Sequence, residues 1–361
     1  MRLGSIQFLR MFAALLIAYL HAIGTQVYTP PGFQEDMARE INEFGIGVDI
    51  FFVISGFIIA LTAGSYEGWR QSLHFLKKRF IRLNPVYYIA LLLFLAVNFH
   101  HMWKTHIPGY GSFLKAILLL PVADTIGWLP SVMPVAWTLN FEWYFYILFA
   151  LAIAIPIKNK HWFLILLCSA LVACYAIDGV TASRIWFITN PIMLEFLMGI
   201  AIFLWYRRST PPPRIAYGLL IGGVALALYD ILRGTTFVND VYGTAEGRIA
   251  LLRMLHMGIP AALLVAGCLF LEKNGLLAPL WNNRYVQLLG NASYSIYLIH
   301  YTTYFALAAL FLRLGPVLNI NLSVSLWFLI ATVSGILFYR YVEEPLLQRL
   351  GRITPGAAVS C

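Results

Sequence analysis

The chain contains about ten apolar stretches, each long enough to cross the ~30 Å hydrocarbon core of a bilayer as an α-helix. Of its 361 residues, 60% are hydrophobic and only 11% are charged, whereas a typical soluble domain has about 25% charged residues. So few charges cannot cover the surface of a soluble fold, and we therefore predict an all-α, polytopic membrane protein. The predicted helices span approximately residues 6–24, 44–64, 85–103, 135–157, 162–177, 187–205, 216–231, 249–271, 293–312 and 324–342.

An eleventh apolar segment, near 113–130, is interrupted by Pro121, Asp124, Gly127 and Pro130. We interpret it as a re-entrant or interfacial segment, because ten spans place most lysines and arginines on one side of the membrane. Cytoplasmic loops carry that basic excess, so both termini are predicted to be cytoplasmic. We expect one membrane domain, residues 1–361, with no appended soluble domain.

The net charge of +9 is explained by these topology signals and by anionic lipid headgroups. The sequence has no soluble, basic, aromatic-rich module of the kind that binds nucleic acid. Its four cysteines lack the spacing of a disulfide framework or a zinc site. We expect no metal site and no permanently bound cofactor.

Two basic side chains lie inside the first apolar segment, and a charge there is costly and usually functional. Arg10 and His21 are eleven residues apart, which is within ~20° of three full helical turns. They therefore share one face, about 16 Å apart along the axis. This arrangement predicts a ligand or reaction path that runs through the bilayer.

Among the other titratable residues within predicted spans, four are candidates for the site: Asp49, Glu142, Glu195 and His300. With His21, Asp49 and Glu142 are biased towards the outer leaflet, and a histidine beside a carboxylate is the usual arrangement of a general base. The alternative for each is a buried hydrogen bond that fixes helix packing.

A basic segment precedes the third predicted helix. Arg79 and Arg82 point the same way if this segment is helical, and Pro85 suits a helix start. Paired guanidinium groups there suit a phosphate-bearing ligand, although an ordinary positive-inside anchor would look similar. Separately, Ser55-Gly56 would let another helix pack closely.

Together these pieces resemble the acyltransferase-3 family of integral membrane O-acyltransferases, in particular the branch that acetylates bacterial exopolysaccharides. The resemblance covers nearly the whole chain. It rests on Leu9-Arg10 with His21, Gly47-Val-Asp49-Ile-Phe-Phe-Val-Ile-Ser55-Gly56-Phe57, Arg79-Phe-Ile-Arg82, Trp137-Thr-Leu with Glu142-Trp-Tyr-Phe-Tyr146, Leu289 to His300 and Val342-Glu343-Glu344-Pro345.

The resemblance implies an acyl-coenzyme A donor on the cytoplasmic side and a sugar hydroxyl as acceptor. By position it makes His21 the catalytic residue, and it assigns donor binding to Arg10, Arg79 and Arg82. We expect Glu142, rather than Asp49, to orient the His21 imidazole. A covalent acyl-histidine intermediate is an open alternative to direct transfer.

Ser55, Trp137, Tyr297 and His300 are expected to line the pore or the substrate path. The predicted function is transfer of an acyl group, most simply acetyl, to a hydroxyl of an exopolysaccharide or its lipid-linked precursor. The predicted location is the bacterial inner membrane, beside the polysaccharide synthesis machinery. One alternative function is a transporter or flippase of a polysaccharide precursor, which would also carry intramembrane charges. Another is a non-catalytic membrane partner of a polysaccharide synthase.

Overall fold

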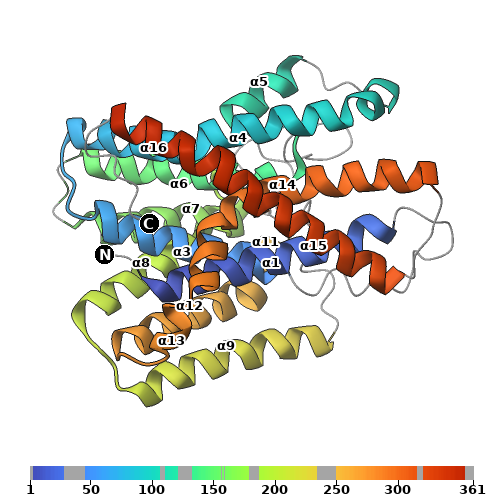
Figure 1. Cartoon of the computed structure of the whole chain (residues 1–361). Coiled ribbons are helices and arrows are strands. Elements are labelled where there is room, and N and C mark those ends of the chain that lie inside the picture. Colours follow the sequence, from blue (N-terminus) through green and yellow to red (C-terminus); the bar gives the residue numbers. More distant parts are fainter. Residues whose placement is uncertain are drawn as a thin grey trace.

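The computed structural model describes residues 3–27, 45–105, 110–120, 132–155, 157, 159–178, 187–233, 249–314 and 320–353. Every regular element within these ranges is helical, as predicted (Figure 1). The longer helices are α1 (Gly4–Val27), α3 (Ile46–Ala63), α4 (Trp69–Thr105), α6 (Trp137–Ala154), α7 (Lys160–Asp178), α8 (Met193–Arg208), α9 (Pro213–Arg233), α12 (Ile259–Lys273), α14 (Arg284–Leu314) and α15 (Ile320–Phe338).

Shorter elements complete the fold: α5 (Tyr110–Leu118), η2 (Pro134–Ala136), α11 (Ala250–Arg253), α13 (Ala278–Trp281) and α16 (Glu344–Ile353). Two π-helical turns, η4 (Met254–Gly258) and η5 (Tyr339–Glu343), join α11 to α12 and α15 to α16. Such turns are rare and are frequently found at functional sites.

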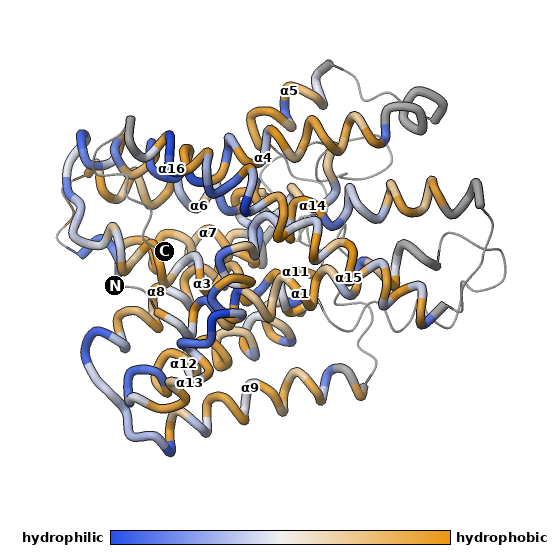
Figure 2. Tube along the Cα trace, in the orientation of Figure 1, coloured by the Kyte–Doolittle hydropathy of each residue, from blue (hydrophilic) through white to orange (hydrophobic). Residues whose placement is uncertain are grey.

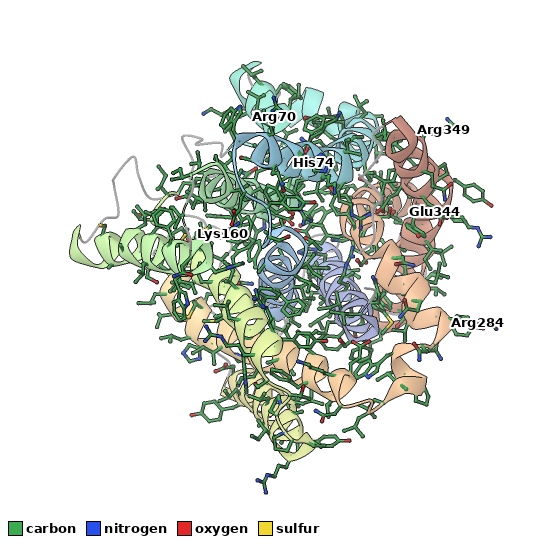
Figure 3. The ribbon with its side chains drawn as sticks, turned by 90° about the vertical axis from the view of Figure 1, so that its left-hand side faces the viewer. Arg70, His74, Lys160, Arg284, Glu344 and Arg349 are labelled. Carbon is green, nitrogen blue, oxygen red and sulfur yellow. The ribbon has the colours of Figure 1, made fainter. Side chains whose placement is uncertain are left out.

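The structure is that of a membrane protein. Six helical stretches within the described residues are long and apolar enough to span a bilayer, and Figure 2 shows hydrophobic residues along much of the length of the helices. The first residues of α1 and the whole of α16 lie at the same end of the bundle (Figure 1). Figure 3 faces that end and labels six charged or titratable side chains around it: Arg70, His74, Lys160, Arg284, Glu344 and Arg349.

Each of the ten predicted spans has a helical counterpart, but some boundaries were wrong. The third span does not start at Pro85, because α4 begins at Trp69 and carries this proline in its interior. Neighbouring helices allow internal prolines in membrane helices. Glu195 was expected near the middle of its helix and lies in the first turn of α8. Of the predicted re-entrant segment, α5 is a short separate helix and residues 121–131 lie outside the described residues.

Glycine permits a close crossing of α3 and α8. A Cβ on Gly56 of α3 would lie 2.0 Å from the Phe196 carbonyl oxygen, and one on Gly199 of α8 would lie 2.1 Å from that of Val53. The backbones of α3 and α8 therefore touch, which only residues without a side chain permit. The close packing predicted at Ser55-Gly56 is confirmed.

Helix α1 packs against α3, α12, α14 and α15. A Cβ on Gly290 of α14 would lie 2.4 Å from the Gln7 carbonyl oxygen of α1, so these two helices are also in close contact. Two further contacts, Arg10 with Ser293 and His21 with His300, follow in the same order along both helices. Helices α1 and α14 therefore run parallel.

Candidate active site

A cavity of ≈ 120 Å³ lies between five helices, α1, α3, α4, α6 and α14. Six of the residues singled out from the sequence contribute to its lining: Arg10, Ser55, Arg79, Arg82, Glu142 and Tyr297. Their positions in the chain are up to 287 residues apart, so it is the tertiary fold that assembles them.

Each arginine of the cavity is held by a different partner. Arg10 donates from Nε to Ser293 Oγ (3.2 Å), and Arg79 donates from Nη2 to Thr62 Oγ1 (3.0 Å). Arg82 forms an ion pair with the buried Glu343. Because α4 is helical from Trp69 onward, Arg79 and Arg82 lie on one face and reach the same cavity, as their spacing predicted.

Glu142 is the acidic residue of the cavity lining. Its carboxylate accepts a hydrogen bond from Ser55 Oγ (3.0 Å) and another from the Tyr146 hydroxyl one turn away. The guanidinium of Arg79 lies over the Tyr146 ring, 5.5 Å from its centroid. The site thus combines three arginines with two acids, Glu142 and the Arg82 partner Glu343. Positive charge is in excess, which suits an anion.

The catalytic candidate, His21, pairs with another histidine. Its Nδ1 lies 2.8 Å from Nε2 of His300 on α14, and His300 Nδ1 lies 3.0 Å from the Ile296 carbonyl oxygen. The Tyr301 ring meets His21 edge-on, with centroids 4.8 Å apart. The orienting role predicted for Glu142 stays a prediction, since the described hydrogen bonds of Glu142 go to Ser55 and Tyr146.

Tyr297 connects the cavity to the histidine pair. It lines the cavity, and its ring centroid lies 6.0 Å from that of His300. Its hydroxyl bonds to Thr138 Oγ1 (2.9 Å) and donates to the Val135 carbonyl oxygen (2.7 Å). Tyr297 therefore borders both the arginine-lined space and His300, whereas His21 is not among the lining residues.

Asp49 has a different environment from the one predicted. Its carboxylate forms a two-point ion pair with Arg253 through Nε (3.1 Å) and Nη2 (2.7 Å), and both side chains are almost fully buried. The buried Glu195 is close enough to interact with both. Asp49 is not among the residues that line the cavity, and this ion pair ties α3 to α11.

Two predicted pore residues lie outside the cavity lining. Trp137 is buried, and its ring centroid lies 6.4 Å from that of Phe52 and 6.1 Å from that of Phe141. His300 instead contacts His21. Arg253 was not predicted as a site residue, although it is, like Arg10, a charged residue within a predicted apolar span. Within the described residues, no group of three or more histidine, cysteine or acidic side chains is placed to hold a metal ion.

Comparison with known proteins identifies the family of the chain. The profile of a family described as an acyltransferase domain matches residues 3–340. The exopolysaccharide production protein ExoZ of Rhizobium meliloti is 31% identical over 323 residues, covering 86% of this chain and 93% of that protein. The acyltransferase MdmB of Streptomyces mycarofaciens is 26% identical over 395 residues, covering 99% and 94%.

A third relative is longer than this chain. The peptidoglycan O-acetyltransferase OatA of Listeria monocytogenes is 27% identical over 334 residues, which cover 83% of this chain and 51% of that protein. No solved structure matches the chain. Because the family profile matches from residue 3 to residue 340, the chain belongs to the acyltransferase-3 family of membrane proteins.

Proposed function

We propose that this protein is an O-acyltransferase that moves an acetyl group from acyl-coenzyme A to a hydroxyl of an exopolysaccharide or its lipid-linked precursor. The names of two relatives, an exopolysaccharide production protein and a peptidoglycan O-acetyltransferase, support a carbohydrate acceptor. A multi-pass protein with this activity would work in the bacterial inner membrane, where cytoplasmic donor and surface-bound acceptor are both within reach.

The observation that carries the proposal is the assembly of three arginines in one cavity next to a histidine pair. The phosphates of coenzyme A would bind Arg79 and Arg82 on α4, with Arg10 guiding the arm of the donor. Guanidinium groups bind phosphate through paired, charge-assisted hydrogen bonds. The arm would pass Tyr297 and bring the thioester to His21.

In the proposed reaction, neutral His21 takes the proton of the acceptor hydroxyl as that oxygen attacks the acyl carbon. The carbon–sulfur bond breaks, the ester forms, and the thiolate of coenzyme A receives the proton from His21. Protons and charge balance without a metal or a redox partner. In the competing route, His21 attacks the thioester itself and carries the acyl group.

Transfer of label from radiolabelled acetyl-coenzyme A to polysaccharide tests the proposal, in membranes that carry the wild type, His21→Ala or His256→Ala. His256 is the matched control because it lies in η4 and is not among the cavity residues. We expect transfer with the wild type and the control variant, and none with His21→Ala. Retained transfer in folded His21→Ala would refute the catalytic role of His21.

The same membranes separate an acyltransferase from a transporter. A transporter or flippase would move its substrate without consuming a thioester, so release of free coenzyme A would not depend on the acceptor. We expect acceptor-dependent release with the wild type. Label on the protein itself that is trapped in the absence of acceptor, is removed by hydroxylamine and is absent from His21→Ala would favour the acyl-histidine route.

A further inference from the structure

We infer that His300 is a positioning residue that holds the proton of His21 on Nδ1 and so makes Nε2 the basic nitrogen of the catalytic imidazole. The inference rests on the proposed function, in which His21 accepts the hydroxyl proton. It assigns His300 a role other than lining the substrate path.

At the far end of the pair, inside α14, His300 contacts a backbone carbonyl. His300 is completely buried, and its Nδ1 lies 3.0 Å from the carbonyl oxygen of Ile296, one turn earlier. A carbonyl oxygen can only accept a hydrogen bond, so Nδ1 must carry the proton. In a neutral imidazole the other nitrogen, Nε2, then has the lone pair and can only accept.

The lone pair of His300 in turn determines which nitrogen of His21 carries the proton. Nε2 of His300 lies 2.8 Å from Nδ1 of His21, so this Nδ1 must be the donor. The ring planes are within 4° of each other while the centroids are 5.0 Å apart. Since the nitrogens are much closer than the centroids, the rings meet edge to edge, and the N–H points at the lone pair. Neutral His21 therefore carries its own lone pair on Nε2.

The surroundings hold both rings in this geometry. The ring centroids of Tyr297 and Tyr304 lie 6.0 and 5.8 Å from that of His300, and the ring of Tyr301 lies edge-on to both histidines. The Tyr304 hydroxyl donates to the Ala18 carbonyl oxygen of α1 (2.7 Å), which ties the two helices together one turn from His21. His300 is thus built to accept from His21 in one orientation.

This order of protons matters because the two tautomers of a free imidazole present their lone pairs on opposite sides of the ring. A partner that selects one tautomer keeps the base directed at the substrate, and in serine proteases loss of the corresponding partner lowers kcat by about 10⁴-fold. Here the partner is a neutral histidine rather than a carboxylate, so we expect a smaller factor, about 10²-fold.

Two substitutions of His300 test the inference by activity. His300→Leu removes the acceptor, whereas His300→Gln keeps a carbonyl oxygen that can accept near the position of Nε2. We expect kcat to fall by about 10²-fold in His300→Leu, with the apparent KM for acetyl-coenzyme A changed less than twofold, and most of the rate to return in His300→Gln. Equal losses in both variants, or a loss that appears in KM instead, would overturn the positioning role.

A direct measurement does not depend on activity. In protein labelled with ¹⁵N-histidine and held in lipid nanodiscs, the ¹⁵N chemical shifts distinguish the two neutral tautomers, and the His21→Ala spectrum identifies the signals of His21. We expect the Nδ1-protonated form in the wild type and a mixture in His300→Leu. An Nε2-protonated His21 in the wild type would refute the inference, even where His300→Leu fails to fold. Failure of the proposed function would appear separately, as retained transfer in His21→Ala.

Discussion

Arg82 of α4 donates to Glu343, a carboxylate with no exposed surface that lies 261 residues later in the chain. Glu343 also accepts a hydrogen bond from Ser295 Oγ (2.5 Å), so it connects α4, α14 and the π-helical turn η5 that leads into α16. Arg82 is therefore expected to have two functions: it neutralises a buried acid, and as a cavity residue it would bind the proposed donor.

These two functions can be separated by mutation. Removing one partner of a buried ion pair costs about 3–5 kcal/mol, because the other charge stays buried. We expect Arg82→Ala to unfold at a lower temperature in detergent, and Arg82→Ala with Glu343→Gln to recover most of that loss. The apparent KM for acetyl-coenzyme A should stay raised in both. If donor affinity returned together with stability, Arg82 would serve only to neutralise Glu343.

Arg79 should act on donor binding more than on folding. It is half-exposed and its described hydrogen bond is to the Thr62 hydroxyl, so Arg79→Ala leaves no buried charge behind. A hydrogen bond to a charged group contributes about 1.5–3 kcal/mol, which corresponds to a rise in apparent KM of about 10- to 100-fold. Arg70→Ala, an exposed arginine on the same helix, is the control, and an unchanged KM in Arg79→Ala would count against the phosphate site.

Glu142 should oppose donor binding through its charge. It lines the same cavity as three arginines, so Glu142→Gln makes the site more positive while it keeps an acceptor for Ser55 and Tyr146. We expect the apparent KM for acetyl-coenzyme A to fall severalfold, and the effect to shrink at high ionic strength. A fall in kcat with no change in KM would instead support the predicted action of Glu142 on the imidazole.

Asp49 should matter for stability because it holds Arg253. Both charges are buried, so Arg253→Met should lower stability by about 3–5 kcal/mol, and Asp49→Asn with Arg253→Met should recover much of it. Thermal unfolding followed by tryptophan fluorescence measures both. Loss of transfer in Asp49→Asn at an unchanged unfolding temperature would restore Asp49 to the catalytic role expected from its sequence.

The α3–α8 crossing should not tolerate a methyl group. In Gly56→Ala the new Cβ would lie 2.0 Å from the Phe196 carbonyl oxygen, whereas a Cβ on Gly218 of α9 meets no heavy atom within 4 Å. Overpacking of this kind costs about 1–3 kcal/mol, while Gly218→Ala should be neutral or stabilising by up to about 1 kcal/mol. Equal unfolding temperatures for the two variants would contradict the observed crossing.

Local patterns in the sequence identified much of this site. The eleven-residue spacing of Arg10 and His21 and the three-residue spacing of Arg79 and Arg82 depend only on helical geometry, and the structure retains both. The start of α4 was wrong for a local reason as well, because Pro85 is a breaker in water but is held in place by neighbouring helices in a bundle.

Partner choice was beyond the reach of such patterns. The contact between His21 and His300 joins residues 279 positions apart, and that between Asp49 and Arg253 joins residues 204 apart. A single sequence shows that each buried polar group needs a partner, but several candidates have the right chemistry. The packing of α1 on α14 makes the choice, and it gave His21 a histidine where a carboxylate was expected.

The two polar contacts of α1 have a mechanical consequence. Arg10 bonds to Ser293 and His21 bonds to His300, so both ends of the intramembrane stripe are fastened to the same neighbouring helix. Sliding or rotating α1 against α14 would break the donor side and the chemical side together. Helices α1 and α14 thus form one fixed unit, and we expect any opening that admits the proposed donor arm to involve the other cavity helices, α3, α4 and α6.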